Sequence, residues 1–304
     1  DKYKSEDYEQ VVDILDVWFD SGATHSFVLE ERIDLKWPAS LYLEGSDQHR
    51  GWFHSSLLES CGTRGIAPYE RVLTHGFVLA EEGVKMSKSQ GNVVAPQEII
   101  QNYGADILRL WVVGSDYSED LKIGPDIIKH QTDAYRRLRN TFRYLLGNLH
   151  EFDEKESVEF SEMPELERFI LHRLAELDIL IRDCCEKFDF HRVFTALHNF
   201  CTIELSSFYF DIRKDTLYCD RVDDIQRRAA RTVLNELFSC LTAWFAPIIC
   251  FTAEEAWLNR YPDQNKVDSV HLRQFPGIPS AWMNEALGKK WEKARTLRRV
   301  VTGA

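Results

Sequence analysis

Two different hydrophobic patterns divide the chain. Up to about residue 120, short apolar runs alternate with helical patterns. "ASLYLEG" predicts a strand that ends on Gly45, and "RVLTHGFVL" predicts a second strand from Arg71 to Leu79. "HRGWFHSSLLESCG", between them, predicts a helix that closes at Gly62. Strands that alternate with helices indicate a parallel α/β sheet, although there are too few strands for a complete doubly wound sheet.

Two further segments complete this first part. "APQEIIQNYG" predicts a short helix, with Pro96 near its start and Gly104 just past its end. "ADILRLWVVG" is apolar on both faces, so we expect it to be buried.

The pattern changes after Pro125. From Ile128 the apolar residues recur at the spacing of amphipathic helices, and polar segments such as "RKDTLYCDRVDD" separate the runs. Four helices are predicted, which together indicate an antiparallel bundle. Their apolar positions are Tyr135, Leu138, Phe142, Leu145 and Leu149; Leu166, Phe169, Leu174, Leu177 and Leu180; Phe190, Val193, Phe194, Leu197, Phe200 and Phe208; and Ile225, Val233, Leu237, Leu241, Trp244 and Ile248. A Pro-containing tail then leads into a new helix from about Trp282.

Composition narrows the class of protein. A length of 304 residues suits two domains, and a hydrophobic fraction of 44% is ordinary for a globular protein. No apolar run approaches the roughly 20 residues that span a bilayer, so no membrane association is expected. The 7 cysteines form no CxxC pair, which favours buried, reduced thiols and a cytoplasmic location over disulfides or zinc.

The net charge of −12 argues against indiscriminate nucleic-acid binding, but it does not exclude local basic faces. Between Asp126 and His150 there are five Lys or Arg residues against two Asp, and a second basic cluster follows on a later helix. These residues either bind phosphates or form salt bridges along helix faces. They are Lys129, Arg136, Arg137, Arg139 and Arg143, and then Arg227, Arg228 and Arg231.

Polar residues follow both predicted strands. Glu44, Asp47 and Gln48 come at the end of the first strand, and His75 comes near the end of the second. Ligands of open α/β sheets bind outside the carboxyl ends of the strands, where carboxylates and an amide suit an ammonium group and ribose hydroxyls. The alternative is a polar loop with a helix cap. A single His without a second ligand at metal spacing does not predict a metal site.

A cationic segment, "GVKMSKSQGN", follows the second strand. Lys85 and Lys88 lie between glycines, and lysines on such a loop suit a polyphosphate whose charge shifts in a transition state. A solvated hairpin tip is the alternative. In "DVWFDSG", Trp18 is either a ligand-pocket wall or part of a packed core.

Five motifs in this order resemble one family. "KMSKS", "DVWFDSG", "YLEGSDQHRGWF", "LTHGFV" and "GADILRLWV" are similar to motifs of the bacterial isoleucyl-tRNA synthetase family of class I aminoacyl-tRNA synthetases. "YRRLRNTFRYLLGNL" and "FYFDIRKDTLYCD" resemble the anticodon-binding helices of that family, so the resemblance covers essentially the whole chain. The implied fold is a partial Rossmann-type nucleotide-binding sheet with a KMSKS loop, followed by an all-α anticodon-binding bundle.

The resemblance implies an isoleucine–tRNA ligase, whose partners are ATP with Mg²⁺, L-isoleucine and tRNA(Ile), acting as a monomer. Isoleucine is activated to isoleucyl-adenylate and is then transferred to tRNA. By motif, Trp18 and Gln48 border the amino-acid pocket, and Lys85 and Lys88 stabilise the triphosphate and the leaving pyrophosphate. The implied ATP and adenylate contacts are Glu44, Gly45, Asp47, Gln48, His75, Phe77, Val78 and Lys88. No metal ligand is implied within the chain.

The sequence also departs from the family. No "HxGH" occurs, so the HIGH motif is absent, and the editing insertion and the cysteine-ligated zinc region expected at the bacterial C-terminus are absent as well. We expect residues 1–122 to be the second half of the catalytic domain, 123–275 the anticodon-binding bundle and 276–304 the start of a C-terminal junction. By itself the chain is expected to be inactive.

Two other functions remain open at this point. The chain could act as a tRNA-binding module without catalysis. A pantothenate-type ligase with a similar lysine loop is disfavoured, because such an enzyme has no use for an anticodon-reading bundle.

Overall fold

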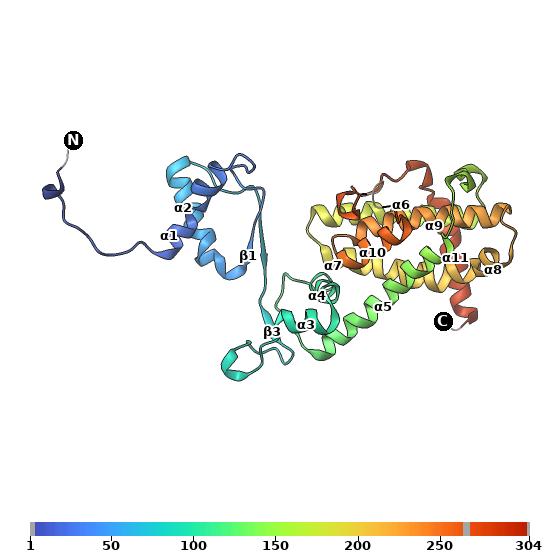
Figure 1. The fold of residues 1–304 in the computed structure, drawn as a ribbon, viewed down its shortest axis with the longest axis horizontal. Coiled ribbons are helices and arrows are strands. Elements are labelled where there is room, and N and C mark those ends of the chain that lie inside the picture. The colour runs from blue at the N-terminus through green and yellow to red at the C-terminus, as the bar shows by residue number, and fades with distance from the viewer. Residues whose placement is uncertain (1–3, 264–267, 303–304) are drawn as a thin grey trace. The chain divides into compact units, whose positions relative to one another are not determined.

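The computed structural model describes residues 4–263 and 268–302. The chain forms two compact units (Figure 1). Unit 1 contains the chain up to Leu79 together with Tyr117–Leu121, and unit 2 contains Ala80–Asp116 and the chain from Lys122 onward. The chain passes between the units in two short strands, β3 (Val78–Ala80) and β4 (Leu121–Ile123), which pair with each other.

Unit 1 contains a strand–helix–strand arrangement. β1 (Tyr42–Gly45) and β2 (Val72–His75) are parallel neighbours, and α2 (Trp52–Arg64) connects them. The parallel pairing predicted from the sequence is therefore confirmed. Tyr42 anchors the unit, since its ring stacks on Trp52 at 4.3 Å between centroids and its hydroxyl lies 3.1 Å from that of Ser56.

Two predicted boundaries in unit 1 are wrong. α2 continues through Gly62 to Arg64 and is capped by Gly65, whose φ of 77° is the left-handed conformation that favours glycine after a helix end. The second predicted strand is interrupted at Gly76, so that β2 ends at His75 and β3 begins at Val78.

A short helix, α1 (Val17–Gly22), packs on α2. The Asp16 side chain caps α1 by accepting a hydrogen bond from the backbone N–H of Trp18. The approach is close at Gly22, where an added Cβ would lie 2.6 Å from Oε1 of Glu59. Burial raises the pKa of Glu59. The π-helical turn η2 (His25–Glu30) follows, and Arg64 ties it to α2 through Glu30 at 2.6 Å. A further short turn is η1 (Ser5–Asp7).

Unit 2 is largely helical, as predicted. α9 packs against α5, α6, α8 and α10, which makes it the central helix of the bundle (Figure 1). The helices of this unit are α3 (Pro96–Tyr103), α4 (Ala105–Val113), α5 (Pro125–Asn148), α6 (Glu165–Glu186), α7 (Phe190–Asn199), α8 (Phe210–Cys219), α9 (Ile225–Phe245), α10 (Cys250–Arg260) and α11 (Glu285–Thr302). The shorter turns are η4 (Lys88–Gln90), η5 (Glu154–Glu156), η6 (Phe160–Glu162), η8 (Val270–Leu272) and η9 (Ser280–Trp282).

The sequence pattern locates most of these helices but not all their details. The helix predicted from Phe190 includes a ten-residue π-helical stretch, η7 (Phe200–Tyr209), between α7 and α8. The fourth predicted helix ends at Phe245, because Pro247 and a turn follow it, and α10 then begins as a separate helix. No described helix is both long enough and apolar enough to cross a membrane.

Two side chains of α4 fasten it to the start of α10. The buried carboxylate of Asp106 accepts hydrogen bonds from the backbone N–H of Phe251 and from the N–H and hydroxyl of Thr252. Arg109 donates to the carbonyl oxygens of Pro247 and Ile248 at 2.7 and 2.9 Å. Because a carboxylate is favourable at a helix N-terminus, Asp106 fixes where α10 begins.

A buried ion pair joins α6 to α8. Glu167 is fully buried, and its two carboxylate oxygens each accept a hydrogen bond from Arg213 at 2.6 Å. The hydroxyl of Tyr209 donates to the same carboxylate at 3.2 Å. Since burial raises the pKa of Tyr209, this hydroxyl keeps its proton and remains a donor.

Removal of one partner of this pair should be costly. We expect Arg213→Ala to lower the free energy of unfolding by about 3–5 kcal/mol, because the carboxylate of Glu167 is left buried without a counter-charge. Urea unfolding followed by circular dichroism at 222 nm measures this loss.

The matched control is Arg136→Ala. Arg136 pairs with Asp133 at 3.2 Å on the surface, where an ion pair contributes at most about 1 kcal/mol. Equal losses in the two variants would contradict the assignment. The double change Glu167→Met with Arg213→Met should recover much of the stability, because no unpaired charge remains.

Candidate functional site

The carboxyl ends of β1 and β2 lie side by side. The parallel register pairs Glu44 with Thr74 and Gly45 with His75. The ring of His75 lies against Gly45, since a Cβ added to Gly45 would be 3.8 Å from its Cε1. The same Cβ would lie 2.6 Å from Oδ1 of Asp47, on the turn η3 (Ser46–Arg50). Four of the predicted site residues therefore meet at one edge of the sheet, and Gly45 leaves the space between two of their side chains.

Gln48 and Trp18 meet over a second glycine. A Cβ added to Gly51 would lie 2.8 Å from Oε1 of Gln48 and 3.3 Å from Cη2 of Trp18. Oε1 of Gln48 accepts the backbone N–H of Trp52, and its Nε2 donates to Asp47 at 3.3 Å. Trp18 remains 42% exposed, so it is not a core residue.

The residues after β2 are positioned by a remote segment. Gly76 donates its N–H to the carbonyl oxygen of Tyr117, and Asp120 accepts the N–H of Phe77 at 2.7 Å. This backbone segment lies so close that a Cβ on Gly76 would be 2.3 Å from the carbonyl oxygen of Glu119. Phe77 and Val78 are held in place by their backbone while their side chains stay exposed.

Glu44 and His75 keep their polar groups close to the backbone. The carboxylate of Glu44 accepts the N–H of Gly45 at 3.2 Å, and the side chain is exposed. Nδ1 of His75 lies 2.8 Å from the carbonyl oxygen of Gly76, so it donates there and Nε2 is left as an acceptor. The edge thus offers carboxylate, amide and imidazole acceptors to a ligand that carries hydrogen-bond donors.

The lysine segment lies in unit 2 and has an internal structure of its own. Asn92 closes it, accepting the N–H of Ser87 at 2.8 Å and donating to the carbonyl oxygen of Lys85 at 3.3 Å. Gly83 and Gly91, at φ of 80° and 67°, make turns that favour glycine on either side. The side chain of Lys85 is exposed, and that of Lys88 lies outside the described residues.

The sequence did not identify two of the residues that shape the edge. Asp120 gave no signal, because it lies 43 positions from Phe77 in the chain. Gly51 was visible as a glycine before a helix, but its contact with Trp18 depends on the packing of α1. Among residues 4–263 and 268–302, no group of three His, Cys, Asp or Glu side chains could hold a metal ion.

Family models match most of the chain. The model of class I tRNA synthetases (I, L, M and V) matches residues 2–124, and that of the anticodon-binding domain of tRNA ligase matches residues 167–303.

Curated relatives extend this match. The chain is 61% identical over 297 residues to an isoleucine–tRNA ligase of Mesorhizobium japonicum and 59% identical over 299 residues to one of Brucella abortus. Each match covers 98% of this chain but only 30% of the relative, so the chain spans about a third of their length.

Solved structures share the fold. One is a ternary complex of Agrobacterium radiobacter K84 agnB2 LeuRS with tRNA and LeuAMS, with a TM-score of 0.64, 18% identity, and coverage of 83% of this chain and 29% of that one. Another is the Mycobacterium tuberculosis methionyl-tRNA synthetase with methionyl-adenylate, with a TM-score of 0.60, 22% identity, and coverage of 80% and 48%.

The close approach at Gly76 can be tested against a second glycine of unit 1. We expect Gly76→Ala to separate residues 117–121 from β3, because the backbone leaves no room for a methyl group, at a cost of about 1–3 kcal/mol. Hydrogen exchange measured by mass spectrometry should show faster exchange in peptides that cover residues 76–79 and 117–121.

Gly62→Ala is the control. Its Cβ would meet nothing within 4 Å inside α2, so it should stabilise the helix by about 0.5–1 kcal/mol and leave exchange at residues 117–121 unchanged. Unchanged exchange in the Gly76 variant would refute the close approach.

Proposed function

The chain belongs to the class I aminoacyl-tRNA synthetases, and from this premise we propose that it serves the ATP-dependent attachment of L-isoleucine to tRNA(Ile). One geometric observation carries the proposal: the register that sets Gly45 beside His75 gathers Glu44, Asp47 and Gln48 at the carboxyl edge of a parallel strand pair. The identity of 56–61% to isoleucine–tRNA ligases supports isoleucine as the amino acid.

The proposed reaction has two steps. A carboxylate oxygen of isoleucine attacks the α-phosphorus of ATP, the bond to the bridging oxygen breaks, and pyrophosphate leaves with Mg²⁺. A hydroxyl of the terminal ribose of tRNA then attacks the carbonyl carbon, AMP leaves, and the hydroxyl proton is released. Positioning and electrostatic stabilisation account for such a reaction, without a protein nucleophile.

Each residue of the sheet edge has a proposed role. Glu44, Asp47 and Gln48 accept hydrogen bonds from the substrate ammonium group and from the ribose hydroxyls. Gly45 lets the nucleotide approach the backbone, because any side chain there would meet Asp47. Trp18 forms a wall of the isoleucine pocket beside Gln48. His75, Phe77 and Val78 line the adenine site.

The lysine segment is proposed as the KMSKS loop of a Rossmann-type nucleotide site. Lys85 and Lys88 stabilise the triphosphate and the leaving pyrophosphate by charge. Mg²⁺ is carried by the phosphates, in keeping with its preference for phosphate oxygens and water over a cage of protein ligands. A zinc site is assigned only to a C-terminal region outside this chain.

The domain assignment is also a proposal. We assign residues 1–122 to the catalytic domain, 123–275 to the anticodon-binding bundle and 276–304 to a C-terminal junction. The start of α5 at Pro125 and the family model that ends at residue 124 support the first boundary. A monomer in the cytoplasm, with tRNA(Ile) as its macromolecular partner, is the proposed state.

A segment exchange tests the function. This chain should replace the matching segment of the M. japonicum isoleucine–tRNA ligase and keep isoleucine-dependent ATP–pyrophosphate exchange. Lys85→Ala with Lys88→Ala in that hybrid should lower kcat by about 10²–10³, because charge stabilisation of the leaving group is lost. Lys36→Ala, which removes only a surface pair with Glu70, should leave kcat unchanged. A hybrid whose exchange is indifferent to the two lysines would contradict their role.

The chain alone is expected to be inactive in adenylate formation. It spans about a third of the length of its relatives and its sequence contains no HxGH motif. The purified chain should show no isoleucine-dependent exchange above the rate without isoleucine, while the M. japonicum enzyme serves as the positive control. ATP–pyrophosphate exchange by the chain at a rate near that of the control would overturn this expectation. It would also argue against the chain being a tRNA-binding module without catalysis.

A further inference from the structure

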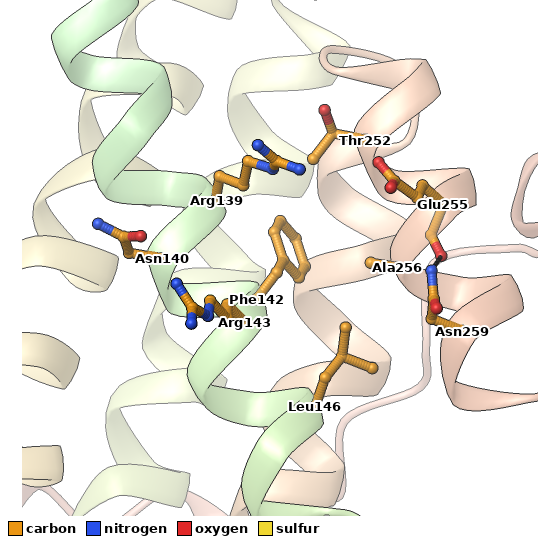
Figure 2. A pocket seen from close by; sticks show the side chains of 9 residues that line it. All are labelled: Arg139, Asn140, Phe142, Arg143, Leu146, Thr252, Glu255, Ala256 and Asn259. Carbon is orange, nitrogen blue, oxygen red and sulfur yellow. Dashed lines mark hydrogen bonds between the residues drawn. The ribbon is translucent and has the colours of Figure 1, made fainter.

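A pocket of about 410 Å³ opens between α5 and α10. Its floor is apolar and consists of Phe142, Leu146 and Ala256 (Figure 2). Phe142 is rigidly held, because its buried ring packs edge-on against Phe245 with 5.8 Å between centroids. A cavity of this volume, with an apolar floor and a polar rim, has the form of a small-molecule or nucleotide site.

Two arginines of α5 stand on the rim. Arg139 and Arg143 are one helical turn apart, and Figure 2 shows Arg139 extending toward α10. In the part of the chain that the structure describes, neither guanidinium has a carboxylate within 4.0 Å or a hydrogen-bond partner. Like charges at this spacing repel each other, so an anion between them would be stabilising.

Three other arginines of the two basic clusters are engaged in contacts within the protein. Arg231 is 9% exposed and binds Glu156 at 2.6 Å and the carbonyl oxygens of Asn148 and His150. Arg228 donates to the carbonyl oxygen of Glu156, so both side chains hold the loop after α5. Arg136 pairs with Asp133. The structure thus assigns these three to salt bridges and loop support, and it leaves the pair at the pocket available.

The opposite rim restricts the ligand. Glu255 of α10 is exposed and faces the pocket, and Asn259 donates its Nδ2 hydrogen to the Glu255 backbone carbonyl at 2.8 Å, which leaves its Oδ1 as an acceptor (Figure 2). A simple anion would be repelled by this carboxylate. A ligand with both an anionic group and a hydrogen-bond donor would suit the site, because the arginines bind the anion and Glu255 or Asn259 accepts from the donor.

RNA has both groups within one nucleotide. We propose that this pocket binds the sugar–phosphate backbone of tRNA: Arg139 and Arg143 hold a phosphate, Glu255 accepts the hydrogen bond of a ribose 2′-hydroxyl, and the apolar floor contacts the sugar or base face. The 2′-hydroxyl is the group by which a protein distinguishes RNA from DNA. This inference rests on the proposed function, since it names the residues with which the bundle holds its tRNA.

Binding of a tRNA transcript with an isoleucine anticodon tests the proposal. In filter binding at low salt, Arg139→Gln with Arg143→Gln should weaken the affinity of the full chain about tenfold. The same variant should reduce the slope of log affinity against log salt by about 1–2, because up to two phosphate contacts are lost. The control is Lys129→Gln with Arg136→Gln, which removes the same charge from the same helix outside the pocket and should change affinity less than about twofold.

A second arm tests the ribose contact. A DNA of the same sequence should bind the wild-type chain more weakly than the RNA, and Glu255→Ala should bring the two affinities together. Circular dichroism verifies that the variants fold, and Arg139→Lys with Arg143→Lys, which keeps the charge, should retain most of the affinity.

The outcomes separate this inference from the proposed function. If the segment-exchange hybrid is active but the pocket and control variants bind tRNA equally well, only the proposed role of the pocket is refuted. Failure of the wild-type chain to bind the tRNA transcript would also refute the role of the pocket. An inactive hybrid would instead count against the proposed ligase function. Equal binding of RNA and DNA would refute the role of Glu255.

Discussion

The helical unit depends on one buried carboxylate. Asp106 accepts four hydrogen bonds at the first turn of α10, one of them from the thiol of Cys250. The Thr252 hydroxyl, which donates another, lies 2.8 Å from the hydroxyl of Tyr135 on α5. α4, α5 and α10 therefore meet at a single anion, whose charge is balanced by the positive end of the α10 dipole. Thr252 also lines the pocket that carries Arg139, so this contact and the pocket share a residue.

The same contact explains why the lysine segment belongs to the helical unit. The segment precedes α3 and α4 in the chain. α4 is bound to the first turn of α10 through Asp106 and to the turn before α10 through Arg109. Leu110 of α4 lies fully buried in the core of the bundle. Sequence neighbourhood places Lys85 next to a strand of unit 1, but long-range packing places it in unit 2.

The sequence pattern predicted those features of the fold that depend on residues close together in the chain. α5, α6 and α9 were recognisable because apolar residues recur at helical spacing along each of them. α10 was missed because Ile248 continues the stripe of α9 beyond its end at Phe245. In unit 1, the parallel direction of the two strands followed from the alternation of strand and helix, whereas their register came only from the structure. The break at Gly76 could not be predicted, because residues 117–121 cause it from a distance. The prediction that Gly62 ends α2 failed for a simpler reason, since Gly65 lies three residues further on and supplies the left-handed cap.

The arginines show the limit of reading charge from sequence. Arg136, Arg139 and Arg143 lie on one helix and look equivalent in composition, yet Asp133 neutralises only the first. Whether a basic side chain is paired or available to a ligand depends on the carboxylates and carbonyl groups near it. These groups come from other turns and other helices. A protein with a negative net charge can therefore have a locally positive surface, where basic side chains have no carboxylate near them. At the α5–α10 pocket the guanidinium groups of Arg139 and Arg143 remain without partners among the described residues. Because these like charges repel each other, an anion bound between them would be stabilising.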